Sequence, residues 1–208
     1  MSSFVKPAST STRNVILVGE PGSGKTSLIN MIAGDIVAPI SEATGTRSCT
    51  AYPIPIGELV YNLYDTPGLD ALGLQNGIDK VTKLIKDMHD GVNLLVFCMR
   101  GRITEDAIAI YKHFSLLIKV PVIAVITGLE HEDPMESWWT KNSAAFKVYD
   151  MLFEDHACVT TLRGKRSIFA AQYEQSKNTV RDLIATHCLQ NGQRAVSSCF
   201  VFTFYMQC

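Results

Sequence analysis

The sequence of 208 residues lacks a strong excess of charge of either sign, because 19 Lys and Arg residues nearly balance 20 Asp and Glu residues. At a net charge of −1, no overall basic character argues for nucleic-acid binding, so we expect no nucleic-acid partner. The sequence also has no apolar run approaching the ~18 residues of a membrane span, and no internal repeat. Only the apolar stretch SSCFVFTFYMQC at residues 197–208 leaves membrane association open.

Cysteine residues are present, but they lack the spacing of a zinc site or a disulfide framework. No C-x-x-C pair occurs, which argues for free thiols in a reducing compartment. We therefore expect a cytoplasmic protein. The six cysteines are Cys49, Cys98, Cys158, Cys188, Cys199 and Cys208.

The stretch GEPGSGKTS, residues 19–27, matches the pattern G-x-x-x-x-G-K-S/T of loops that hold nucleotide phosphates. The run RNVILV before it predicts a buried strand, and SLINMIAG after it has helical spacing that ends at Gly34. A strand, a glycine loop and a helix are the context that this motif requires. The alternative is a flexible turn with a surface lysine. The predicted nucleotide-binding residues here are Gly19, Glu20, Pro21, Gly22, Ser23, Gly24, Lys25, Thr26 and Ser27.

The residue types in this loop suit a phosphate chemically. Successive backbone N–H groups point inward at the positive end of the helix dipole, and both effects favour an anion. Lys25 is expected to reach the outer phosphates, and the Thr26 hydroxyl is expected to bind Mg²⁺.

A second motif, YNLYDTPGLD, ends a predicted strand with Asp65, Thr66, Pro67 and Gly68. An Asp at a strand tip beside the phosphate loop can hold Mg²⁺, usually through a water. Gly68 can bring its N–H close to a γ-phosphate, because it has no side chain in the way. The alternative is an ordinary junction between strand and turn, where Asp, Pro and Gly are common. Together with the phosphate loop, the motif favours the nucleotide interpretation.

Runs with the composition of strands alternate with runs of helical spacing along the chain. Residues 51–56 and 59–65 predict an antiparallel hairpin, and two prolines place its first strand at a sheet edge. This order predicts a mainly parallel sheet, covered on both faces, with ligands beyond the carboxyl ends of its strands. Helices are expected over 78–88, 104–118, 133–153 and 174–190, and further strands over 92–99, 120–127 and 157–161.

The order of glycine loop, threonine-bearing loop, D-x-x-G and a later loop resembles the translation-factor-related class of P-loop GTPases. DTPGL resembles the septin branch and the immunity-associated, chloroplast-import-receptor-like branch, and RGRITEDAIAIY is similar to the immunity-associated group. Five stretches look closer still to uncharacterised fungal G-domain proteins. They are RNVILVGEPGSGKTSLINMIAG, LLVFCMRGRIT, VITGLE, SWWTKN and HACVTT.

The expected fold class is α/β, the three-layer P-loop NTPase fold. It has a mainly parallel sheet of about six strands with one antiparallel edge hairpin, and helices on both faces. We expect a disordered lead-in at residues 1–12, a G domain at 13–190 and an atypical apolar tail at 191–208.

In this class a loop after the fifth main strand reads guanine, usually as N/T-K-x-D, and VITGLE occupies that place. The resemblance gives Thr127 the first position and Glu130 the last, where a carboxylate accepts from guanine N1–H and the exocyclic amine. Gly128 departs from the usual Lys, whose stem lies along the base, and this weakens the expected preference for guanine. The alternative is a plain loop between strand and helix. A further loop could contact the base through N–H groups around Thr160 and Thr161.

The resemblance also implies a switch threonine that binds Mg²⁺ and holds the attacking water. Thr44, Thr46 and Thr50 compete for that role, and Thr46 fits the family spacing before Tyr52 best. Leu69 stands where many relatives carry a glutamine that orients the water, which predicts slow turnover.

Arg100 and Arg102 lie in a loop at the same edge of the sheet. Either could stabilise the transition state, in cis or across a dimer, but a solvated basic loop is the favoured interpretation. Septin-like branches often dimerise across the nucleotide face, so such a homodimer is one expected partner.

We expect a guanine-nucleotide-binding protein that is a slow, Mg²⁺-dependent GTPase and works as a switch or an assembling unit. GTP or GDP and Mg²⁺ are its expected ligands. Two alternatives stay open: a module that binds GTP without turnover, and, less favoured, an ATP-using P-loop enzyme. The expected catalytic residues are Lys25, Thr46 and Gly68, and the expected metal-binding residues are Thr26, Thr46 and Asp65.

Overall fold

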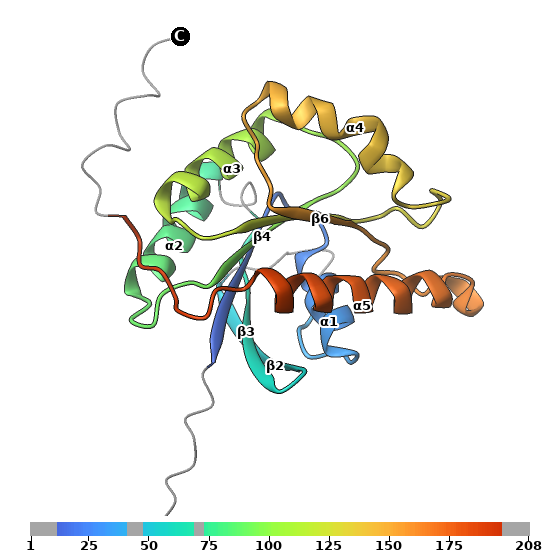
Figure 1. The fold of residues 1–208 in the computed structure, drawn as a ribbon, viewed down its shortest axis with the longest axis horizontal. Coiled ribbons are helices and arrows are strands. Elements are labelled where there is room, and N and C mark those ends of the chain that lie inside the picture. Colours follow the sequence, from blue (N-terminus) through green and yellow to red (C-terminus); the bar gives the residue numbers. More distant parts are fainter. Residues whose placement is uncertain (1–11, 41–47, 69–72, 197–208) are drawn as a thin grey trace, which may run out of the picture.

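The computed structural model describes residues 12–40, 48–68 and 73–196, which form one sheet with helices on both faces (Figure 1). The strands lie in the order β2-β3-β1-β4-β5-β6, and only β2 runs antiparallel to its neighbour. This arrangement confirms the predicted α/β fold and its six-stranded, mainly parallel sheet. The strands are β1 (Arg13–Val18), β2 (Thr50–Ile56), β3 (Leu59–Asp65), β4 (Leu94–Met99), β5 (Val122–Ile126) and β6 (Asp155–Cys158).

The edge hairpin also forms as predicted. β2 carries Pro53 and Pro55 and pairs with β3 alone, so the missing N–H groups of the prolines cost no bond to a second strand. Gly57, in the turn that joins the two strands, has a φ of 61°, which favours glycine.

Helices cover the two faces of the sheet in two separate groups. Side chains of α1 and α5 pack on one face together with Val15 and Leu17 of β1. Side chains of α2, α3 and α4 pack on the other face together with Ile16 and Val18. Alternate residues of β1 therefore serve opposite layers, as expected for a strand buried on both sides. The helices are α1 (Lys25–Ala33), α2 (Leu74–Asp87), α3 (Glu105–Leu117), α4 (Ser137–Val148), the short 3₁₀ helix η1 (Lys165–Ser167) and α5 (Ala170–His187).

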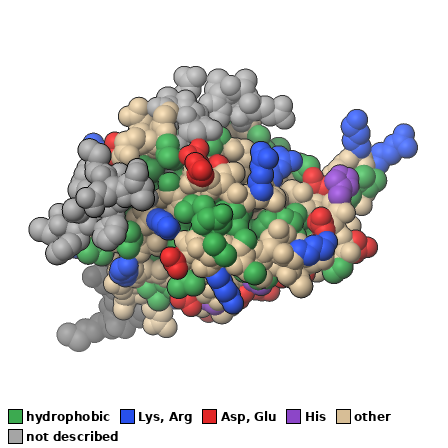
Figure 2. Space-filling model, turned by 90° about the horizontal axis from the view of Figure 1, so that it is seen from above, with side chains coloured by type: hydrophobic (Ala, Val, Ile, Leu, Met, Phe, Trp, Pro, Cys, Tyr) green, Lys and Arg blue, Asp and Glu red, His purple; other side chains and the backbone are tan. Residues whose placement is uncertain are grey.

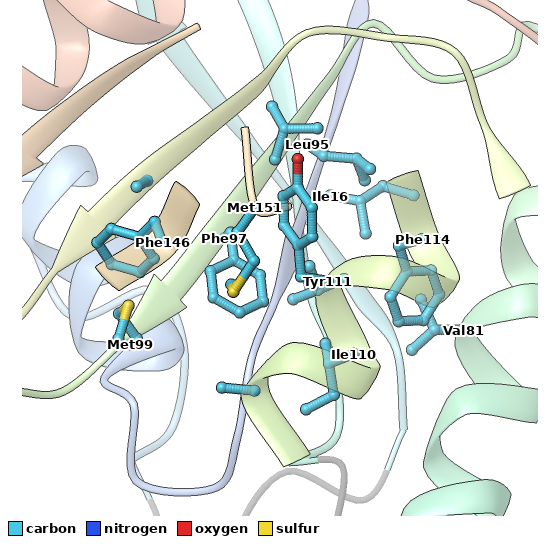
Figure 3. Close-up of a cluster of buried hydrophobic side chains, with 14 of the residues drawn as sticks. Ile16, Val81, Leu95, Phe97, Met99, Ile110, Tyr111, Phe114, Phe146 and Met151 are labelled. Carbon is cyan, nitrogen blue, oxygen red and sulfur yellow. The ribbon is translucent and has the colours of Figure 1, made fainter. Parts of the chain in front are cut away.

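The core under α3 and α4 is rich in aromatic rings (Figure 3). Phe97 of β4 meets Tyr111 of α3 edge to face, with ring centroids 5.8 Å apart. Phe146 of α4 packs in the same cluster. Burial of these rings fixes β4, α3 and α4 against one another, so the loops that follow β4 and β5 start from fixed positions.

Hydrophobic side chains also reach the surface on the α3–α4 side. Leu116 of α3 is exposed, as are Val148, Tyr149 and Leu152 at the end of α4. Figure 2 views the molecule from the side where α4 lies and shows hydrophobic side chains among charges of both signs. This mixture agrees with the near-zero net charge of the chain.

Several predicted boundaries are wrong, and the backbone gives some of the reasons. α4 begins at Ser137 instead of residue 133 and ends at Val148 instead of residue 153. Asp150 has a φ of 58°, which is incompatible with a continuing helix. α2 begins at Leu74, directly after Gly73 with its φ of 83°, four residues before the predicted start at residue 78. α5 and β6 likewise begin earlier than predicted, at Ala170 and Asp155.

The carboxyl ends of the five parallel strands meet at one edge of the sheet, and the predicted motifs follow them there. The phosphate loop follows β1, Asp65 ends β3 and the base-reading loop follows β5. Thr44, Thr46 and Leu69 lie outside the described residues, as do 1–11 and 197–208, on which the predicted lead-in and most of the predicted tail fall. Within the described ranges, no helix combines the length and the apolar character needed to cross a membrane.

Candidate functional site

The glycine loop leaves β1 through a position that admits no side chain. Gly19 has a φ of 151°, and a Cβ there would lie 2.1 Å from the carbonyl oxygen of Cys98 in β4. Gly24 has a φ of 87° and is the residue before the first turn of α1. The loop therefore passes close to the sheet and then turns directly into the helix, as the motif predicts.

Lys25 is the most buried cation at this edge, with 6% of its surface exposed. Its Nζ donates to the carbonyl oxygens of Gly19 and Glu20, both at 2.9 Å, and lies 3.5 Å from Ser23 Oγ. Burial of an ammonium group is costly unless its donors are satisfied, and the loop carbonyls satisfy them. The positive charge is thus held inside the curve of the glycine loop.

The second motif lies directly beside the first. Thr26 Oγ1 donates to Asp65 Oδ2 at 2.7 Å, and Asp65 is only 2% exposed. Thr66 fixes the end of β3, because its hydroxyl donates to the carbonyl of Leu17 in β1 at 2.6 Å. A hydroxyl and a carboxylate are oxygen ligands of the kind that Mg²⁺ prefers, so these residues fit that ion.

Gly68 lies on the glycine loop. A Cβ at Gly68 would come within 2.7 Å of Pro21, so a side chain there would collide with the loop. The two predicted phosphate motifs are thus in contact at two points, Thr26 with Asp65 and Pro21 with Gly68.

The base-reading loop is also tied to the glycine loop. Thr127 is 2% exposed, and its Oγ1 donates to the Ser23 carbonyl at 2.9 Å. A Cβ at Gly24 would lie 3.1 Å from the same hydroxyl, so the two loops are closely packed. The predicted residue Thr127 therefore joins the two halves of the site.

Glu130 is held by a residue from a different strand end. Thr160, which is fully buried, donates from Oγ1 to Glu130 Oε2 at 3.1 Å. The Thr160 N–H donates to Ser176 Oγ at 3.1 Å. The Thr160 N–H is thus already bonded to α5, and the expected contact of N–H groups around Thr160 and Thr161 with the base stays a prediction. The hydroxyl of Thr160, whose role the sequence reasoning missed, orients the predicted base-reading carboxylate.

The other predicted loop residues differ in their surroundings. Glu20 turns its side chain toward α3, where its Oε1 accepts from Thr104 Oγ1 at 2.6 Å. Thr104 is the residue before α3, and its side chain caps that helix by accepting from the Ala107 N–H at 3.0 Å. Ser27, in the first turn of α1, is half-buried, and Pro21 and Gly22 are exposed. Thr50, one of the three switch candidates, pairs opposite Asp65 in the β2–β3 register.

The cysteines near Asp65 are held as neutral thiols. Burial raises the pKa of Cys98 to about 12, with Lys25 opposing this shift and Asp65 adding to it. Burial, reinforced by Asp65, also raises the pKa of Cys49 to about 11. Both thiols are therefore protonated at neutral pH.

A glycine loop between β1 and α1, with a buried lysine at its end, defines a P-loop nucleoside-triphosphate-binding domain. The family described as 50S ribosome-binding GTPase matches residues 14–128, which is more than half of the chain, and the chain belongs to this family. It is thus a GTP-binding G domain related to known GTPases. This finding confirms the predicted class of protein.

Among curated proteins, the tRNA modification GTPase MnmE of Rhizobium meliloti (strain 1021) is 29% identical over 136 residues. The match covers 64% of this chain and 28% of MnmE, so the chain spans less than a third of that relative. The predicted closer resemblance to fungal G-domain proteins stays a prediction.

Two solved structures share the fold. Era, in complex with MgGDPNP and a segment of 16S ribosomal RNA, has a TM-score of 0.67 at 18% identity, covering 92% of this chain and 61% of its own. Toc33 from Arabidopsis thaliana, in a dimerization-deficient mutant form, has a TM-score of 0.62 at 16% identity, covering 89% of this chain and 88% of its own. At these identities the likeness shows the fold alone.

Proposed function

We propose that this G domain is a slow, Mg²⁺-dependent GTPase that works as a nucleotide-controlled switch or assembling unit. The observation that carries the proposal is the gathering of Lys25, the Thr26–Asp65 pair and the Glu130 loop around one glycine loop. Each of these groups matches one part of GTP: the outer phosphates, the phosphate-bound metal and the base.

On the phosphate side, residues 19–27 bind the triphosphate through Lys25 and through the main-chain N–H groups of the loop, which all of these residues except Pro21 carry. Thr26 and Asp65 hold Mg²⁺, together with Thr46 as the switch threonine. When bound, the metal supplies positive charge that offsets the charge on the β- and γ-phosphates. Gly68 brings its N–H to the γ-phosphate, because its contact with Pro21 places it at the rim of the loop. Lys25, Thr46 and Gly68 are thus the residues that we assign to catalysis.

On the base side, Glu130 accepts from guanine N1–H and from the exocyclic amine. The hydrogen bond from Thr160 engages Oε2 of Glu130 and so orients the carboxylate. The other carboxylate oxygen of Glu130, Oε1, is not engaged by Thr160. A charge-assisted hydrogen bond contributes about 1.5–3 kcal/mol. Adenine presents no such pair of donors, so the same carboxylate disfavours ATP. Thr127 and Gly128 complete the base-reading loop.

Turnover is slow in this proposal, because Leu69 cannot orient the attacking water by hydrogen bonding. A homodimer across the nucleotide face could supply the missing group. A module that binds GTP without turnover is the second candidate, and it is favoured by the same Leu69. We also propose a cytoplasmic location and no nucleic-acid partner, as expected from the cysteines and the balanced charge.

Nucleotide affinity tests the proposal. We expect purified protein to bind GDP and GTP, to bind ATP at least 100-fold more weakly, and to lose GTP affinity when Mg²⁺ is removed. Equal affinity for ATP and GTP would instead favour an ATP-using enzyme. Release of phosphate over many turnovers, measured at low and high protein concentration, separates the slow GTPase from the module without turnover. A rate per molecule that rises with concentration supports the homodimer.

A further inference from the structure

The base-reading loop lacks a side chain at Gly128, and an arginine from another strand end lies in that place. The three heavy atoms nearest to the position of a Cβ on residue 128 all belong to Arg100. They are Nε at 2.9 Å, Cγ at 3.3 Å and Cδ at 3.6 Å. A lysine at position 128 would have to share this space with the arginine. The glycine and the arginine are thus sterically complementary.

The sheet brings these two residues together. Met99 pairs with Ile126 in the β4–β5 register, and the Thr127 N–H donates to the Met99 carbonyl at 2.9 Å. Arg100 directly follows the last residue of β4, so the chain leaves the sheet there beside the start of the base-reading loop. The pairing of β4 with β5 therefore sets the backbone position of Arg100, as it sets that of Thr127.

The loop that carries Arg100 is anchored from both sides. The Arg102 N–H donates to the Arg100 carbonyl at 3.0 Å and closes a tight turn at Gly101. The indole Nε1 of Trp138, a buried residue of α4, donates to the Gly101 carbonyl at 3.3 Å. The turn fixes the backbone of this loop, and the Arg100 side chain lies beside Gly128, whereas in the part of the chain that the structure describes no such contact is found for Arg102, which is exposed two residues further along.

The guanidinium of Arg100 is available for a ligand. Arg100 is exposed, and within residues 12–40, 48–68 and 73–196 no hydrogen bond or ion pair of its side chain is found. A guanidinium is planar, always charged and weakly hydrated, and it stacks on aromatic rings. These properties allow the Arg100 guanidinium to stack on the flat face of a purine.

We propose that Arg100 stacks on the face of the purine and replaces the lysine stem that Gly128 does not provide. The proposal rests on the proposed guanine-nucleotide function and assigns the arginine to nucleotide affinity rather than to hydrolysis. Glu130 reads the edge of the base, whereas Arg100 covers its face. The two residues thus contribute separately, one to the choice of base and the other to affinity for any purine.

Arg100→Ala tests this division, with Arg102→Ala as the matched control from the same loop. We expect Arg100→Ala to weaken GDP and IDP by the same factor, about tenfold, since both bases offer the same kind of face. Competition by inorganic tripolyphosphate, which has no base, should stay within twofold of wild type. Arg102→Ala should leave all three affinities within twofold. Arg100→Lys, which keeps the charge but loses the plane, should recover only part of the loss.

Three outcomes would overturn the inference while leaving the proposed function intact. The first is a wild-type affinity for GDP together with a wild-type rate of phosphate release in Arg100→Ala. The second is unchanged GDP affinity with slower phosphate release, which would make Arg100 the cation for hydrolysis. The third is an equal loss of tripolyphosphate binding, which would show that the arginine only supports the glycine loop. If wild-type protein bound no guanine nucleotide at all, the proposed function itself would fall, and the inference with it.

Discussion

The phosphate side of the site, built by residues 19–27, Asp65 and Gly68, differs in construction from the base side, built by residues 127–130, Thr160 and Arg100. On the phosphate side the two charged groups assigned to the phosphates and the metal are nearly inaccessible, with Lys25 6% and Asp65 2% exposed. On the base side Glu130 is half-buried and Arg100 is exposed. The first region follows its sequence pattern closely, whereas the second departs from its pattern at Gly128.

The physical reason lies in what each region uses to bind. Backbone N–H groups and close approaches leave no choice of residue at Gly19 or Gly68, where a Cβ would collide with backbone or ring atoms. A base platform needs only a flat or apolar surface in the correct place, and a side chain from any neighbouring strand end can provide it. The phosphate side is thus constrained mainly by backbone geometry, whereas the base side depends more on which side chains lie beside it.

Removal of the buried cation should have the largest effect. We expect Lys25→Ala to weaken both GDP and GTP by at least 100-fold, because more than one charge-assisted bond to phosphate oxygens is lost. Isothermal titration measures this, with Lys83→Ala on the exposed face of α2 as the control. Circular dichroism should show a folded variant. A folded Lys25→Ala protein that kept its affinity would disprove the phosphate side as described.

The metal pair should have the next largest effect. We expect Asp65→Asn to weaken GTP by about tenfold in Mg²⁺ and to differ little from wild type in EDTA. The GTP affinity that Asp65→Asn loses should therefore equal the GTP affinity that wild-type protein loses when Mg²⁺ is removed. Titration of GTP affinity against Mg²⁺ measures both, and Asp79→Asn on α2 is the control. If the GTP affinity of Asp65→Asn depended on Mg²⁺ as strongly as that of wild type, Asp65 would not be a ligand of the metal.

On the base side, Glu130→Gln should change the selectivity for the base and leave the affinity for the phosphates unchanged. The amide keeps one acceptor but adds an N–H donor, which matches the C2 carbonyl of xanthine. We expect Glu130→Gln to bind GTP about tenfold more weakly and XTP more tightly, and to bind tripolyphosphate with unchanged affinity. Competition against labelled GDP measures the three ligands. If all three weakened together, Glu130 would be a structural residue of the loop.

The smallest effects are expected from removing two buried hydroxyls, one on the base side and one on the phosphate side. Thr160→Val removes the donor to Glu130, and Thr66→Val removes the donor to Leu17. Each should lower stability by about 1 kcal/mol, which urea unfolding measures. Only Thr160→Val should reduce the preference for GTP over ITP, by about threefold. A similar change in Thr66→Val would mean that the two sides are not independent.

Residues 19–27 and the later pair Asp65 and Gly68 are each recognisable from the sequence, because each belongs to a short motif whose backbone conformation is local, and their role in binding phosphates stays a prediction. The hairpin is recognisable in the same way, since the prolines of β2 indicate an edge. The contact of Thr160 with Glu130 and that of Arg100 with Gly128 depend on strand order and register, which no local pattern encodes. Gly128, a small residue in an otherwise recognisable motif, shows that a side chain is missing there, but it does not identify Arg100 as the residue beside it. Helix boundaries were least predictable, since Asp150 ends α4 through a backbone conformation rather than a proline or glycine.

Competition of labelled GDP by GTP, ITP, XTP and ATP on purified wild-type protein tests the central claim most directly. The claim is that a rigid phosphate site is combined with a carboxylate that reads the guanine edge. It predicts that GTP competes best, that ITP is weaker by about the value of one hydrogen bond to the exocyclic amine, and that ATP is weakest. ATP and GTP competing equally, each dependent on Lys25, would contradict the reading of guanine by Glu130.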